Sequence, residues 1–139
     1  MMRRKRPGGS VGLAAIVTWL ITAMLGIRLL RLWLSHGGPR RQAAKVTRFP
    51  AVLLFAHPAL ALTALGCWGA YLTTSHRILA WLAFGALALT ALLGFTMSTR
   101  WLGGGRHARG ADQPLPLLTA LLHLTGGLTT FVLLLLTRV

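Results

Sequence analysis

The stretch TAMLGIRLLRLWL at residues 22–34 occurs a second time, in altered form, as TALLGFTMSTRWL at residues 90–102. The two stretches lie 68 residues apart and share six of 13 positions, among them a threonine, a glycine and a tryptophan. Shared leucines and alanines mean little in so apolar a chain, whereas the other three residues are informative. Self-similarity at a fixed spacing is the signature of a repeated structural unit. The sequence therefore predicts two copies of one unit.

Each copy continues past its tryptophan with the same pattern. A Gly- and Arg-rich segment comes first, at 35–49 and 103–115. An apolar run then starts at a proline and reaches a histidine seven residues later, as PAVLLFAH at 50–57 and PLLTALLH at 116–123. The spacing between the copies falls to 66 here because the second basic segment is two residues shorter.

Four apolar runs account for most of the chain. Hydrophobic residues make up 55% of the 139 residues and charged residues 12%, and the mean hydropathy is +0.66. A helix that crosses a bilayer needs about 20 mostly apolar residues. We therefore expect an all-α integral membrane four-helix bundle, a single domain over 1–139, with repeat 1 at about 11–74 and repeat 2 at about 77–137. The expected helices are 11–34, 51–74, 77–100 and 115–137.

The repeat also predicts symmetry. Each unit crosses the membrane twice, so both units enter it in the same direction and should be related by a pseudo-twofold axis along the membrane normal. Short connections favour an up-down-up-down bundle, in which the second and fourth helices lie on a diagonal. His57 and His123 then lie at the same depth on opposite sides of the axis.

Basic residues outnumber acidic ones by 15 to one, which gives a net charge of +14. They gather at helix ends and between helices and form no basic helix face, which argues against nucleic acid as a partner. Lipid phosphates attract such residues, so we expect anionic lipid as a partner, with an acidic subunit of a complex as the alternative. Trp33 and Trp101 are expected to anchor in the membrane interface.

The two histidines inside apolar runs differ from the other three. His36, His76 and His107 fall at helix ends or between helices, where a solvated side chain needs no special role. His57 and His123 lie about two turns inside their helices, and an ionisable residue at that depth marks a functional site by default.

Small residues surround this pair. Ala61 and Ala64 follow His57 on its face of the helix. Gly126 and Gly127 follow His123, and Thr130 comes one turn later. On the other two helices, Gly26 and Gly94 have matching depths. Such residues clear space for a flat ligand, although they also serve close helix packing.

One haem b held by His57 and His123 satisfies this pattern, since imidazole is a common axial ligand of haem iron. The ring nitrogen away from iron needs an acceptor, expected to be a carbonyl one turn earlier on the same helix or, for His123, Thr119. Arg28, Arg31 and Arg100 should meet lipid head groups or, alternatively, haem propionates. Histidines that only join helices, a chlorophyll, and a metal site stay open as alternatives. A metal site without a cofactor would have few ligands, because Asp112 and Cys67 are the only carboxylate and thiol side chains.

The arrangement resembles the small b-type membrane cytochromes, namely the four-helix cytochrome b561-like proteins and the haem-bearing anchor subunits of respiratory dehydrogenases. The resemblance covers all four helices but rests on their arrangement. It implies His57 and His123 as axial ligands and a location in a prokaryotic inner membrane. Such families often use four intramembrane histidines for two haems, whereas this chain has two such histidines, which limits it to one haem.

We therefore expect an electron-transfer or accessory subunit rather than a stand-alone enzyme. No flavin, nicotinamide or phosphate-binding motif is present, so a redox role needs a quinone or other membrane protein subunits as partners. A cofactor-free scaffold subunit and a chlorophyll-type pigment-binding subunit are the alternatives.

Overall fold

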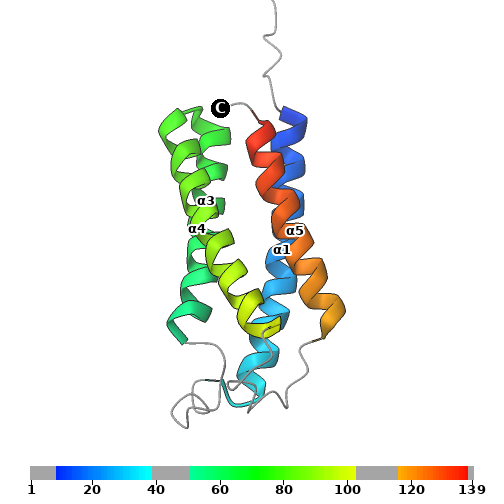
Figure 1. The fold of residues 1–139 in the computed structure, drawn as a ribbon. Helices are drawn as coiled ribbons and strands as arrows, with labels where there is room; N and C mark the ends of the chain where they lie inside the picture. The colour runs from blue at the N-terminus through cyan, green and yellow to red at the C-terminus, as the bar shows by residue number, and fades with distance from the viewer. Residues whose placement is uncertain (1–8, 39–50, 103–115, 138–139) are drawn as a thin grey trace, which may run out of the picture.

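The computed structural model describes residues 9–38, 51–102 and 116–137, which form four α-helices and no strand (Figure 1). The bounds are α1 Gly9–Ser35, α3 Ala51–Thr74, α4 Arg77–Leu102 and α5 Leu117–Leu136. The expected helices are confirmed, and their ends differ from the predicted ones by at most two residues.

Each helix is long and apolar enough to cross a membrane. The shortest, α5, has 20 residues, which corresponds to about 30 Å, the thickness of a bilayer's hydrocarbon core. Large apolar side chains cover the outside, such as Val52 with 80% of its surface exposed and Met24 with 72%. An exposed apolar surface of this extent needs lipid around it. The described chain therefore has the build of an integral membrane protein with four spans.

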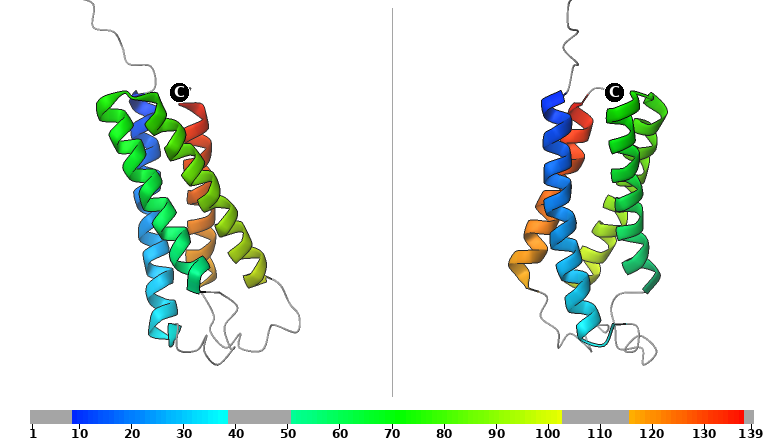
Figure 2. Two further views of the ribbon diagram at one scale, coloured as in Figure 1. Left: turned by 90° about the vertical axis from the view of Figure 1, so that its left-hand side faces the viewer. Right: turned by 180° about the vertical axis from the view of Figure 1, so that it is seen from behind.

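The helices pack as two close pairs. α1 lies along α5 and α3 lies along α4, while α1 with α3 and α4 with α5 make smaller contacts (Figures 1 and 2). α1 and α4 are thus opposite each other, as are α3 and α5. A tight turn at Ser75 and His76 joins α3 to α4, and Ser75 has a positive φ of 59° while its N–H donates to the Tyr71 carbonyl. α1 extends beyond the ends of the other three helices at its C-terminal end (Figure 2).

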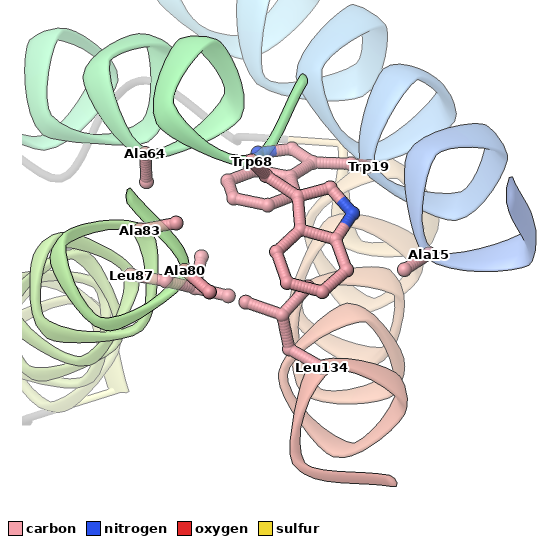
Figure 3. Packing of buried hydrophobic residues seen from close by; sticks show 8 residues of the cluster. All are labelled: Ala15, Trp19, Ala64, Trp68, Ala80, Ala83, Leu87 and Leu134. Carbon is pink, nitrogen blue, oxygen red and sulfur yellow. The ribbon is translucent and has the colours of Figure 1, made fainter. Parts of the chain in front are cut away.

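The buried apolar core cluster lies towards one end of the described helices, and Figure 3 shows its side chains converging from all four of them. Trp19 and Trp68 are its large members, and small alanines let the helices approach around them. The core residues come from the first halves of α1 and α4 and the last halves of α3 and α5, which lie at the same end of the molecule. They are Ala15, Trp19, Ala64, Trp68, Ala80, Ala83, Leu87 and Leu134.

Trp33 lies within the bundle rather than on its outer surface. It is only 7% exposed and packs edge-on against Phe55 of α3, with 6.3 Å between ring centroids. The expectation that it anchors in the membrane interface stays a prediction. The side chain of Trp101 lies outside the described part of the structure.

Candidate cofactor site

His57 and His123 meet in the half of the bundle away from the apolar core. Their ring centroids are 5.9 Å apart and the ring planes are inclined by 66°. Each histidine is six residues from the first residue of its helix, Ala51 of α3 or Leu117 of α5. At 1.5 Å per residue, both lie about 9 Å from the helix ends. Both are partly buried. The structure thus brings together, across the α3–α5 diagonal, the two histidines that the sequence singled out.

Each imidazole is fixed by a backbone carbonyl of the helix packed beside it. His57 Nδ1 donates to the Thr90 carbonyl of α4 over 3.0 Å, and His123 Nδ1 donates to the Thr22 carbonyl of α1 over 2.8 Å. A carbonyl has no hydrogen, so Nδ1 carries the proton in both rings. Nε2 then has a free lone pair, and it makes no hydrogen bond to any residue that the structure describes.

These acceptors correct the prediction. A carbonyl one turn earlier on the same helix, or Thr119, was expected. Within a helix, each carbonyl points along the helix axis and accepts from the N–H group four residues later. The imidazole projects sideways from its own helix, so it reaches a carbonyl of the neighbouring helix instead. Thr119 is itself buried.

Glycines expose the two carbonyls. Within a helix, the carbonyl of Thr22 serves the N–H of Gly26, and that of Thr90 serves the N–H of Gly94. A Cβ atom at position 26 would lie 2.8 Å from His123 Cε1, and one at position 94 would lie 3.1 Å from His57 Cε1. The absence of a Cβ atom at these two positions lets each ring lie close against the backbone without having to shift. We refer to each Thr-x-x-x-Gly segment as an imidazole seat.

Sequence reasoning placed Gly26 and Gly94 near the histidines but missed this contact. The sequence did contain a signal for this contact, because a threonine precedes the glycine by four residues in both copies. The threonine hydroxyls bond to their own helices, Thr22 Oγ1 to the Thr18 carbonyl and Thr90 Oγ1 to the Ala86 carbonyl, each over 2.8 Å. Their own carbonyls accept from the histidines.

The small residues that follow the histidines lie largely in helix interfaces. A Cβ at Gly126 would clash with Thr22 Oγ1, and one at Gly127 would lie 3.9 Å from Thr22 Cγ2. Ala64 is fully buried in the apolar core, and Ala61 is partly buried. Close packing of α5 on α1 is thus sufficient to explain a glycine at 126. A role for these residues in lining a cofactor stays a prediction.

The spacing of the rings suits two imidazoles on one metal ion. With metal–nitrogen bonds of about 2.0 Å, two imidazoles on opposite sides of one metal ion would have their ring centroids about 6 Å apart. The observed 5.9 Å is close to that value. The described residues contain no group of three or more His, Cys, Asp or Glu side chains. Two imidazole ligands are compatible with haem, whose porphyrin would supply four further nitrogens to the iron.

The other histidines lie elsewhere. His36 and His76 are exposed, and His36 Nδ1 bonds to the Leu32 carbonyl over 2.7 Å. His107 lies outside the described residues. Fold and site together define a four-helix membrane bundle in which two histidines from diagonal helices lie close together. No protein-family model, curated protein or solved structure matches the chain.

Proposed function

We propose that the chain binds one haem b between His57 and His123 and acts as an electron-transfer subunit, linked to a quinone or belonging to a larger membrane complex. The observation that carries the proposal is the proximity of the two imidazoles, whose ring centroids lie 5.9 Å apart and whose Nδ1 atoms are both hydrogen-bonded to a carbonyl. When bound, haem iron supplies reversible one-electron exchange.

The chain's own residues prepare the ligands. A hydrogen bond at Nδ1 fixes the tautomer and the ring orientation and makes Nε2 a stronger ligand. The seats at Thr22/Gly26 and Thr90/Gly94 therefore hold both Nε2 lone pairs ready before any metal arrives. Less movement of the ligands on binding means a lower entropic cost of binding.

The proposal also concerns the symmetry of the fold. We infer two repeats related by a pseudo-twofold axis, so that the two axial ligands are equivalent. Support comes from burial, because buried positions recur at the spacing of the repeat. The pairs are Gly12 and Ala80, Ala15 and Ala83, Trp19 and Leu87, and Thr22 and Thr90 at a spacing of 68, with Ala64 and Thr130, and Trp68 and Leu134, at 66.

The absorbance spectrum of the full chain, purified in detergent from haem-replete cells, tests the proposal. We expect the reduced-minus-oxidised spectrum of a six-coordinate haem b and one haem per chain. A chlorophyll would absorb at different wavelengths and would replace haem in the assignment. A wild-type protein that takes up no tetrapyrrole, even when reconstituted with haem in vitro, would exclude the proposal.

A cofactor-free scaffold is the second candidate, and one observation favours it. Each histidine–carbonyl bond joins two helices, α3 to α4 or α5 to α1, which is what a purely structural histidine does. The same protein sample separates the two functions. A scaffold has no haem and is destabilised by loss of either histidine, whereas a cytochrome loses its spectrum as well.

A further inference from the structure

The outward face of α1 changes from apolar to cationic along one stripe. Val17, Ile21 and Met24 are 56%, 55% and 72% exposed. At 100° per residue, Arg28 and Arg31 follow them within about 40° of the same direction. Both arginines are exposed. One face of this helix therefore continues from hydrocarbon-like side chains directly into two guanidinium groups.

This stripe points away from the histidine pair. The buried residues Ala15, Trp19 and Thr22 lie on the opposite side of α1, together with Gly26, which contacts His123. Arg28 is about 200° around the helix from Gly26. A propionate of a haem held by the histidines is therefore an unsuitable partner for Arg28, and the two arginines need an anion outside the bundle.

The depth of the arginines suits a lipid phosphate. Gly26 is level with His123, which lies about 9 Å inside the end of α5. Arg28 and Arg31 are about 3 and 7.5 Å nearer to that end, while α1 itself continues past it (Figure 2). Side chains of this length reach the head groups from there.

No protein carboxylate competes for these arginines among the described residues. Asp112, the one acidic residue of the sequence, lies outside them. Residues three apart on a helix are neighbours, with about 5–6 Å between Cβ atoms, and guanidinium groups bind phosphate through two parallel hydrogen bonds.

We propose that the outer face of α1 binds an anionic phospholipid, with the phosphate between Arg28 and Arg31 and an acyl chain along Met24, Ile21 and Val17. The apolar stripe continuous with the arginines selects a lipid over a soluble phosphate or an acidic protein. This site is independent of the haem proposal, since it uses the opposite face of the helix.

Native mass spectrometry of the full chain tests the proposal. The protein in detergent is equilibrated with phosphatidylglycerol or with phosphatidylcholine, and the bound lipid is counted. We expect preferential retention of phosphatidylglycerol. Each arginine near a membrane surface strengthens binding about five-fold, so Arg28→Gln/Arg31→Gln should weaken phosphatidylglycerol binding about 25-fold and leave phosphatidylcholine unchanged.

Arg77→Gln is the matched control, because Arg77 is an exposed arginine at the start of α4, at the other end of the bundle. It should retain the lipid like the wild type. Circular dichroism of the double variant checks that its helices persist. Equal retention of phosphatidylglycerol by the double variant and the wild type would overturn the site. Displacement of the lipid by an equal concentration of glycerol phosphate would also overturn the site. A double variant that lost only a co-purifying acidic protein, and no lipid, would overturn it as well.

Discussion

At the scale of single residues, the site consists of two imidazoles that each lie on a glycine of the neighbouring helix. The sequence predicted which histidines and glycines share a depth. It did not predict the pairing, because His57 meets Gly94 of the other copy rather than Gly26 of its own. That choice depends on α3 packing against α4 rather than α1, which is a property of pairs of helices and not of one helix's pattern.

Replacing the seat glycines Gly26 and Gly94 by alanine should destabilise the protein to different degrees. In Gly26→Ala the new Cβ lies 2.8 Å from His123 Cε1, so the ring must move off the Thr22 carbonyl, at a cost of about 1–3 kcal/mol. In Gly94→Ala the separation from His57 is 3.1 Å, and the loss should be smaller. Gly66→Ala, Gly69→Ala and Gly85→Ala are controls, since a Cβ there meets nothing within 4 Å. Unfolding in SDS measures all five. A Gly26→Ala protein as stable as the controls would contradict the close contact between the His123 ring and Gly26.

Replacing the histidines one at a time should have different effects on haem retention for His57 and His123 than for the exposed His36 and His76. His57→Ala and His123→Ala each remove a proposed haem ligand and a hydrogen bond between helices, so both should lose most bound haem and about 1 kcal/mol of stability. His36→Ala and His76→Ala alter exposed side chains and should retain haem like the wild type. Haem per chain, measured after purification, is the readout. Full retention by either of the first two variants would remove that residue from the site.

At the scale of helices, the two close pairs are built differently. α1 and α5 meet through polar small residues, and Thr130 Oγ1 donates to Thr18 Oγ1 over 3.2 Å while Gly126 faces Thr22. In α3 and α4 most of the buried residues are apolar, such as Ala64 and Ala83, and Thr90 is the buried polar residue. Length and hydropathy predicted the helix bounds because membrane thickness fixes both. They did not indicate that Gly126 packs against Thr22, since any small residue in a membrane helix fits either packing or ligand binding.

The contact of Gly126 with Thr22 predicts coupling between the two positions. Gly126→Ala should weaken the α1–α5 pair, because its Cβ clashes with Thr22 Oγ1. Thr22→Ala removes that hydroxyl but keeps the carbonyl that accepts from His123. The double variant should therefore be more stable than the sum of the single effects indicates, by about 0.5–3 kcal/mol. Strict additivity in SDS unfolding would show that the two helices do not touch there.

At the scale of the whole molecule, the described bundle divides into an apolar half and a half that holds the histidines. Trp19 and Trp68 fill the first half. The repeat in the sequence predicted the facing histidines, because equal spacing from a proline sets equal depth. It did not predict that Trp19 and Trp68 of the first copy would form the core together with Leu87 and Leu134 at the matched positions of the second copy, since packing in each copy adjusts to its neighbours.

Electron paramagnetic resonance of the oxidised full chain is the direct test of the proposal that His57 and His123 together ligate one haem iron. The wild type should give a low-spin signal with two imidazole ligands. His57→Gly should lose that signal and recover it when free imidazole is added, because the cavity left by the side chain admits the missing ligand. A high-spin wild-type signal, or a low-spin signal that persists in the His57→Ala/His123→Ala protein, would contradict the claim.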